Sequence, residues 1–90
     1  GDFELNNSEL IIYSTDNNTF NIKLNTNESD LMTFSVYDTT GKIIVFNNIE
    51  KMNNNAYLYD LDMSYASPGV YFVKIGNTLL GHKIGRIIVK

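Results

Sequence analysis

Several residue types are absent or rare in this chain. It has no cysteine and no tryptophan, and it has one histidine and one proline among its 90 residues. Without cysteine, a disulfide scaffold, a thiolate zinc site and a cysteine nucleophile are all excluded. No run of consecutive apolar residues approaches the roughly 20 that a membrane-spanning helix needs, so we expect no membrane insertion.

Acidic and basic side chains are unevenly distributed along the chain. Residues 1–62 hold all ten carboxylates against three lysines, a charge of −7, whereas residues 63–90 hold four cations and no side-chain carboxylate, a charge of +4. The four cations are Lys74, Lys83, Arg86 and Lys90. Such a polarity is typical either of a solvated surface or of an interaction region. Four cations without interleaved aromatic residues do not make a nucleic-acid surface, so we expect no nucleic-acid partner.

Short segments rich in β-branched and aromatic residues recur about every ten residues and are separated by Asn, Asp, Gly and Thr. The length predicts one domain, and the rhythm predicts an all-β, immunoglobulin-like antiparallel sandwich of about seven strands. The expected strands are Leu10–Tyr13, Thr19–Leu24, Leu31–Tyr37, Lys42–Phe46, Ala56–Leu61, Val70–Ile75 and Leu79–Val89. An interruption of the last strand at Gly81 or Gly85 is left open.

Three turn motifs lie between these segments. The sequence DTTG, from Asp38 to Gly41, predicts a type I hairpin turn with a glycine bulge. The sequence GNT, from Gly76 to Thr78, predicts a second tight hairpin. The sequence SPG, from Ser67 to Gly69, predicts a type II turn. The clusters of the thirteen asparagines fall where the strand pattern lapses, and we interpret them as loops.

Residues that could carry catalysis are scarce. His82 has no obvious partner in the sequence, and the serines lie in no nucleophile motif, so we expect no enzyme activity and no cofactor. Asp60 and Asp62 would share a face of an extended strand and are weak candidates for Ca²⁺ binding, but they lack the spacing of a calcium loop. The six tyrosines and five phenylalanines are candidates for a sugar-binding platform, although core packing is the commoner use of such residues.

The last two expected strands carry apolar residues on both faces. Tyr71, Val73 and Ile75 share one face of the first, while Val70 and Phe72 precede Lys74 on the other. Ile88 points away from Ile87 and Val89 in the second. Either these strands are covered on both sides, or their second face is an apolar and basic recognition surface.

Three segments carry a resemblance to a known family. They are FSVYDTTGKIIVF, YLYDLDMSYASPGVYFVKI and KIGRIIVK. In order and spacing they resemble the C-terminal sorting domains of proteins exported by the type IX secretion system of Bacteroidetes. The matching elements are Val36–Asp38, Gly41–Lys42, Gly69–Ile75 and Lys83–Lys90, with Gly85 interrupting the basic and apolar run.

The resemblance implies a non-catalytic sorting signal that directs an upstream cargo domain of the same chain across the outer membrane. Its implied partners are the type IX translocon and a sortase-like processing protease, and its implied route is through the periplasm to the cell surface or medium. Residues 10–90 would form the sorting domain, with residues 1–9 a linker or the remnant of a cleaved tag. The residues expected to form the signal are Gly69, Tyr71, Val73, Lys74, Ile75, Lys83, Arg86, Ile87, Ile88, Val89 and Lys90.

Two other functions remain open at this point. One is an immunoglobulin-like adhesion or carbohydrate-binding module of a cell-surface protein. The other is a structural spacer that supports a neighbouring domain. Within the sorting hypothesis, Tyr71 and Val73 are expected to hold the fold, and Lys74, Arg86 and Lys90 are expected to make direct contacts.

Overall fold

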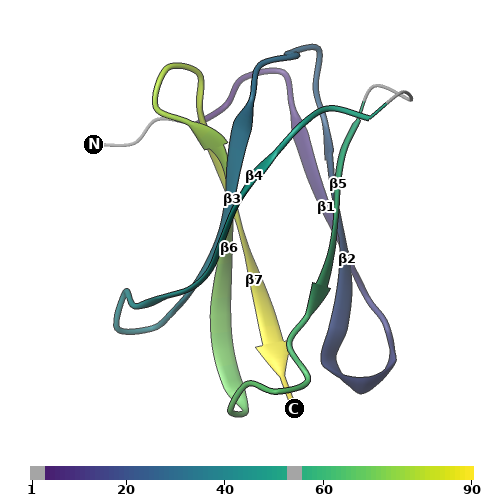
Figure 1. Cartoon of the computed structure of the whole chain (residues 1–90), viewed down its shortest axis with the longest axis vertical. Helices are drawn as coiled ribbons and strands as arrows, with labels where there is room; N and C mark the ends of the chain where they lie inside the picture. Colours follow the sequence, from purple (N-terminus) through teal and green to yellow (C-terminus); the bar gives the residue numbers. More distant parts are fainter. Residues whose placement is uncertain (1–3, 53–55) are drawn as a thin grey trace.

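The computed structural model describes residues 4–52 and 56–90. Seven strands and one short 3-10 turn make up the fold (Figure 1). They are β1 (Glu9–Ser14), η1 (Asp16–Asn18), β2 (Thr19–Asn25), β3 (Met32–Asp38), β4 (Ile43–Ile49), β5 (Ala56–Asp62), β6 (Gly69–Asn77) and β7 (Gly81–Val89). Every expected strand is present. The last strand is continuous through Gly85 and begins at Gly81, two residues later than expected.

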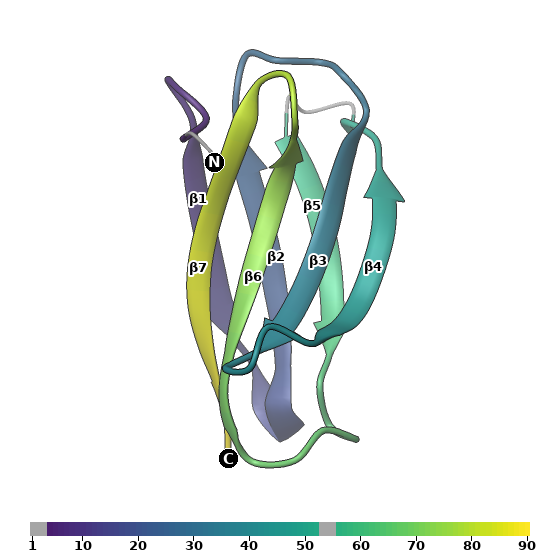
Figure 2. The same cartoon turned by 90° about the vertical axis from the view of Figure 1, so that its left-hand side faces the viewer.

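The strands form two antiparallel sheets that pack face to face. One sheet has the order β1-β2-β5 and the other has the order β4-β3-β6-β7. Figure 2 shows the four-stranded sheet in front, with β7 at one side edge and β4 at the other, and the three-stranded sheet behind it. The predicted all-β, immunoglobulin-like sandwich is therefore confirmed.

The core lies between the sheets and follows the period-two alternation of the sequence. Phe20, Ile22 and Leu24 of β2 and Met32, Phe34 and Val36 of β3 are all buried. The ring of Phe34 stacks on Tyr59 of the opposite sheet, with ring centroids 3.9 Å apart and an interplanar angle of 15°. Because both sheets supply apolar residues at alternate positions, one continuous core holds them together.

Two tyrosines secure connections at opposite ends of the sandwich. The hydroxyl of Tyr71, near the start of β6, donates a 2.7 Å hydrogen bond to the carbonyl of Ser67, four residues upstream. This is the tyrosine corner found where a chain crosses between the sheets of immunoglobulin-like folds. The buried Tyr57 hydroxyl donates to the carbonyl of Asp30 at 2.5 Å. Burial raises the pKa of Tyr57, and the negative charges of Asp30 and Glu28 add to the rise.

The first turn motif folds as predicted. The Gly41 N–H donates to the Asp38 carbonyl at 3.0 Å, and Gly41 has a φ of +90°. The Asp38 carboxylate accepts hydrogen bonds from the Thr40 hydroxyl and from the backbone N–H groups of Thr40 and Lys42. These hydrogen bonds, led by the one from the Thr40 hydroxyl, lower the pKa of Asp38.

The other two turn predictions were wrong in position. Gly76 and Asn77 lie in β6, and the hairpin turn is formed by residues 78–80. Gly76 is needed because a Cβ there would lie 2.1 Å from the Gly81 carbonyl oxygen on the paired strand. Asn77 closes the turn, since its Oδ1 accepts from the Leu80 N–H at 2.7 Å.

The SPG segment is a bend that leads into β6 and not a type II turn. The hydrogen-bonded turn lies just before it, where the Ala66 N–H donates to the Met63 carbonyl at 3.1 Å. Gly69 has a φ of +150°, far from the value near +80° of a type II turn, and it already pairs with Val89 of β7. Strand pairing therefore extends to the glycine that sequence reasoning assigned to the turn.

The described part of residues 1–9 packs on the sandwich. Leu5 is 1% exposed and belongs to the core. Its N–H donates to the carbonyl of His82 at 3.0 Å, and Glu4 forms a parallel bridge with His82. The chain then turns at Asn7, which has a φ of +52°, and enters β1 in the other sheet.

Candidate recognition surface

The outward face of the four-stranded sheet carries the side chains of most interest, and we call it the basic-apolar face. Strand register places its members in rows across the sheet. One row runs Phe46, Ser35, Lys74, Ile84, and the next runs Ile43, Tyr37, Phe72, Arg86. Val70 and Ile88 form a third row on β6 and β7, and Thr33 and His82 lie beyond the first. Four strands thus present aromatic, aliphatic and cationic groups on one side.

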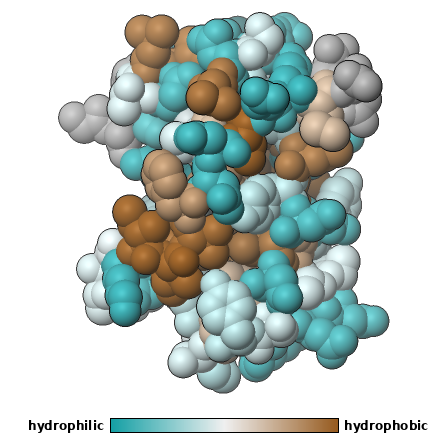
Figure 3. Space-filling view, viewed as in Figure 1, coloured by the Kyte–Doolittle hydropathy of each residue, from teal (hydrophilic) through white to brown (hydrophobic). Residues whose placement is uncertain are grey.

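Exposure distinguishes this face from the core. Ile43 and Phe46 are each 59% exposed, and Ile84 and Ile88 are 54% and 53% exposed. Figure 3 shows an apolar area over the four-stranded sheet on the left of the view. Large apolar side chains gathered at neighbouring exposed positions mark an interaction surface more often than single exposed ones do.

The charged groups on this face are cationic. Lys74 lies opposite Ile84, and Arg86 lies opposite Phe72, so the two cations are diagonal neighbours across β6 and β7. No carboxylate occupies an outward position on β3, β4, β6 or β7, all of which lie within the described residues. Two of the four cations of the C-terminal segment therefore lie on a face whose outward strand positions, all of them described, carry no carboxylate. This face suits an acidic and apolar partner.

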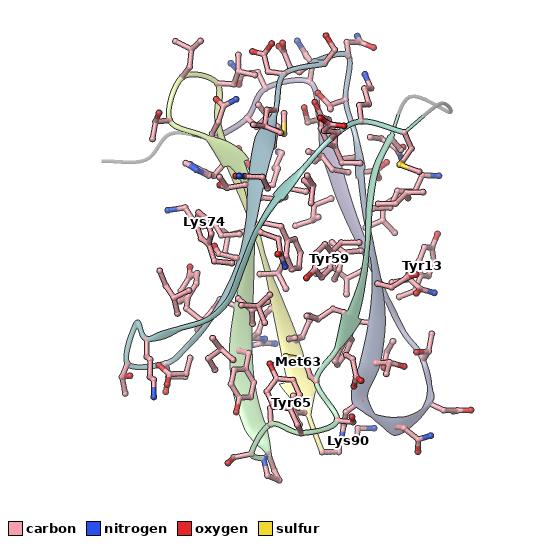
Figure 4. All side chains as sticks on the ribbon, in the orientation of Figure 1. Tyr13, Tyr59, Met63, Tyr65, Lys74 and Lys90 are labelled. Atoms are coloured by element: carbon pink, nitrogen blue, oxygen red, sulfur yellow. The ribbon has the colours of Figure 1, made fainter. Side chains whose placement is uncertain are left out.

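A shallow hollow lies beside Lys74. It has a volume of about 420 Å³, and its lining includes Tyr37, Ile43, Phe46, Lys74 and His82. The ring of Tyr37 stacks on Phe72 with centroids 5.5 Å apart, which fixes one wall. Figure 4 shows the Lys74 side chain pointing away from the sandwich, whereas Tyr59 lies between the sheets.

The structure divides the expected signal residues into two groups by direction. Tyr71, Val73, Ile75, Ile87 and Val89 point inward and are at most 7% exposed. Their side chains belong to the core. Lys74, Arg86 and Ile88 point outward onto the basic-apolar face. Gly69 begins β6.

The two remaining lysines of the expected set lie elsewhere. The Lys83 ammonium lies 2.9 Å from the carboxylate of Glu4, at the side edge of the sandwich. Lys90 follows β7 at the opposite end from the β6–β7 turn (Figure 4). It lies six positions after Ile84, the partner of Lys74, which is about 20 Å along a strand. The structure brings Lys74 and Arg86 together but leaves Lys90 apart.

Sequence reasoning missed Asn18. Its side-chain Nδ2 donates to the Lys90 carbonyl at 3.1 Å, and its Oδ1 accepts from the Lys90 N–H at 2.9 Å. Its own carbonyl accepts from the Met63 N–H at 2.9 Å. Asn17 and Asn18 both have a φ near +60°, a conformation that asparagine tolerates. The Asn-Asn pair signals a turn, but nothing in the sequence links it to a residue 72 positions away.

The candidate calcium residues do not converge with other ligands. Asp60 and Asp62 are exposed, and the Asp62 carboxylate accepts a hydrogen bond from the Ser64 N–H at 2.9 Å. Hydrogen bonds from Ser64 lower the pKa of Asp62. Among the described residues, no three His, Cys, Asp or Glu side chains form a group that could hold a metal ion. Within the same residues, no helix is long and apolar enough to cross a membrane.

A family model matches most of the chain. The model of the family described as secretion system C-terminal sorting domain matches residues 16–90. No curated protein and no solved structure matches the chain. The matched range includes η1, strands β2 to β7 and the whole basic-apolar face. The chain therefore belongs to the family of type IX secretion C-terminal sorting domains.

Proposed function

We propose that this domain is a non-catalytic address that carries an upstream cargo domain through the type IX translocon. The family match, which covers residues 16–90, is the observation that carries this proposal. The cargo passes through the periplasm to the cell surface or the medium. A sortase-like protease of the same system processes the exported chain.

We propose further that the machinery reads the domain on the basic-apolar face. Lys74 and Arg86 are adjacent there, and exposed apolar residues from β4 and β7 surround them. Cations on this face would steer and orient a partner of opposite charge, and the apolar side chains around them would supply the buried area of the contact. In this arrangement the inward residues of the expected set hold the fold, and Lys74, Arg86 and Ile88 make the contacts.

Truncation is a poor test of this proposal. Removal of Lys83–Lys90 would take Ile87 and Val89 out of the core, where they are 3% and 2% exposed. The shortened domain would lose its fold together with any signal. Substitutions of exposed residues can separate a loss of the signal from a loss of the fold.

The test uses a secreted reporter fused in front of this domain, in a host that has the type IX machinery. The variant Lys74→Glu/Arg86→Glu reverses the charge of the basic-apolar face. The control Lys23→Glu/Lys42→Glu makes the same change in net charge, on the three-stranded sheet and in the β3–β4 turn. We expect the wild type and the control to reach the surface or medium, and the face variant to remain in the periplasm.

Two results would oppose the proposal in different ways. If the wild-type fusion is exported no better than the reporter alone, the sorting function is wrong for this chain. If the face variant is exported as well as the control, the function stands and the assigned face is wrong. Thermal unfolding of the isolated variants checks that each one is folded.

A further inference from the structure

The free side of β7 has a defined hydrogen-bonding pattern. β7 is an edge strand of the four-stranded sheet, and its other side pairs with β6. The His82 carbonyl points to the free side, because it accepts from the Leu5 N–H. Backbone groups of successive strand residues point to opposite sides. The N–H and C=O groups of Ile84, Arg86 and Ile88 therefore also point to the free side.

Asn18 occupies the far end of this edge. Its side-chain amide both donates to and accepts from the backbone of Lys90, the two bonds that a residue of a neighbouring strand would make. Lys90 follows Ile88 in the same alternation, so these bonds confirm the direction assigned above. The edge is thus paired at His82 by the N-terminal segment and at Lys90 by a side chain.

Between these two ends, no strand of the described chain pairs with the free side of β7, the side that faces away from β6. The N-terminal segment leaves after Leu5, and β1 pairs with β2 instead. Ile84 and Ile88 are about half exposed, and Arg86 is also exposed. Three alternate residues, Ile84, Arg86 and Ile88, therefore offer three N–H and three C=O groups at an accessible edge, the arrangement used in strand addition.

Because Gly85 has no side chain, side chains of β1 can approach the backbone of β7 closely at this edge. A Cβ at Gly85 would lie 2.6 Å from Cδ1 of Ile12 and 3.3 Å from Cδ2 of Leu10. The two β1 side chains therefore pack directly on the β7 backbone where a larger residue would hold them off. These contacts hold β7 against β1, so the edge to which a strand would be added is fixed in place.

We propose that the edge of β7 from Ile84 to Ile88 accepts one extended segment of a partner protein, with an acidic side chain placed opposite Arg86. This proposal rests on the proposed function and makes the partner a component of the secretion machinery. Lys90 follows the segment and adds a second positive charge, which favours an acidic partner, whereas Lys83 on the other side is paired with Glu4. A second copy of this chain is a poor occupant, because antiparallel pairing centred on this edge would place Arg86 opposite Arg86.

The test compares two substitutions at one residue in the same reporter fusion. Ile84→Pro removes the N–H group on the free side of β7 and so blocks strand addition. It removes no hydrogen bond of the β6–β7 pairing. Ile84→Ala removes the side chain but keeps the N–H. We expect export of Ile84→Pro to fall about tenfold or more below that of Ile84→Ala. Both domains should unfold within about 5 °C of each other.

The pair Ile88→Pro and Ile88→Ala repeats the comparison if Ile84→Pro does not fold. Amide hydrogen exchange of the isolated wild-type domain gives an independent measurement. The N–H groups of Ile84, Arg86 and Ile88 should exchange much faster than those of Gly85 and Ile87, which face β6. Slow exchange at all three would show that the edge is already paired and would overturn the proposal.

Other outcomes are equally decisive. Equal export of the proline and alanine variants, with the wild type exported, overturns strand addition and leaves the sorting function intact. Failure of wild-type export refutes the proposed function itself. A wild-type dimer in solution that Ile84→Pro abolishes would make a second copy the occupant, and the partner proposal would be wrong.

Discussion

The two sheets of this sandwich present different outer faces. The three-stranded sheet places Lys23 opposite Leu58 and Asn21 opposite Asp60, so charges of both signs and amides alternate there. The four-stranded sheet places Lys74 and Arg86 among exposed isoleucines and aromatic rings, with no carboxylate at its outward strand positions in the described chain. The first face mixes charges of both signs with the exposed side chains of Tyr13 and Leu58, whereas the second carries cations and apolar groups and suits an acidic and apolar partner.

This difference teaches how a small domain can hold a signal. A chain of 90 residues needs nearly all of its alternate apolar positions for one core. Apolar residues on the outward positions of β6 and β7 add little to that core. Their presence is therefore informative about function, and the inward positions of the same strands are informative about stability.

The largest expected effect separates these two roles within β7. Ile87 is 3% exposed and its neighbour Ile88 is 53% exposed. Ile87→Ala should lower the free energy of unfolding by about 2–5 kcal/mol, because it leaves a cavity in the core. Ile88→Ala should change it by less than about 0.5 kcal/mol but should reduce export. Urea unfolding and the reporter assay measure the two quantities, and equal destabilisation by both variants would contradict the division of faces.

A smaller effect is expected at the crossing between the sheets. Tyr71→Phe removes the hydrogen bond to the Ser67 carbonyl but keeps the ring in the core. We expect a loss of about 1 kcal/mol in the free energy of unfolding. Tyr65→Phe is the control, since Tyr65 is 66% exposed. If the two variants have the same free energy of unfolding, the hydrogen bond of the tyrosine corner does not stabilise the packing of the two sheets.

The next largest effect is expected from the hydrogen bonds between the side chain of Asn18 in η1 and the backbone of Lys90, which follows β7. Asn18→Gly removes the side-chain amide that binds Lys90 and still allows the left-handed backbone. We expect a loss of about 0.5–1 kcal/mol and faster amide exchange at Lys90. Asn17→Gly is a matched control, because Asn17 has the same left-handed backbone at a φ of 62°. Unchanged exchange at Lys90 in Asn18→Gly would show that this clamp is not formed in solution.

The smallest expected effect concerns two carboxylates, one at a strand end of each sheet. Asp38 ends β3 and Asp62 ends β5, and hydrogen bonds lower the pKa of both carboxylates in the folded state. Their contribution to stability is complete above the pKa of about 3.9 of the unfolded chain, and it is lost as the pH falls through their folded pKa values. Asp38→Asn and Asp62→Asn should therefore each lower the melting temperature at pH 7 and converge on the wild type once the pH falls below the lowered pKa of each carboxylate. Asp60→Asn serves as the control, and melting curves between pH 7 and pH 2 provide the measurement.

Sequence reasoning located the strands well because their signal is local. Alternation in β2 and β3 and the Asp38–Gly41 turn each depend on neighbouring residues, and each prediction was confirmed. The turn near Gly76 was misplaced for a different reason. Glycine there serves a close approach between paired strands, and a sequence gives no sign of which backbone lies opposite.

The candidate site was predictable in its residues but not in its arrangement. Period-two alternation assigned Tyr71, Val73 and Ile75 to one face and Lys74 to the other. That Lys74 and Arg86 are neighbours, and that Lys90 lies about 20 Å along the sheet from Lys74, depends on the register between β6 and β7. The Glu4–Lys83 ion pair and the Asn18–Lys90 clamp join residues 79 and 72 positions apart, and no local pattern announces either.

By itself, the sequence determined the fold class, the strands and the family resemblance, because these depend on periodicity and on short motifs in a fixed order. It also determined that the C-terminal 28 residues carry only positive side-chain charge. The tertiary structure alone decided which of these residues meet on one surface and which edge of β7 stays open. Those properties arise from strand order and register, which are set by the packing of the whole core and not by any one segment.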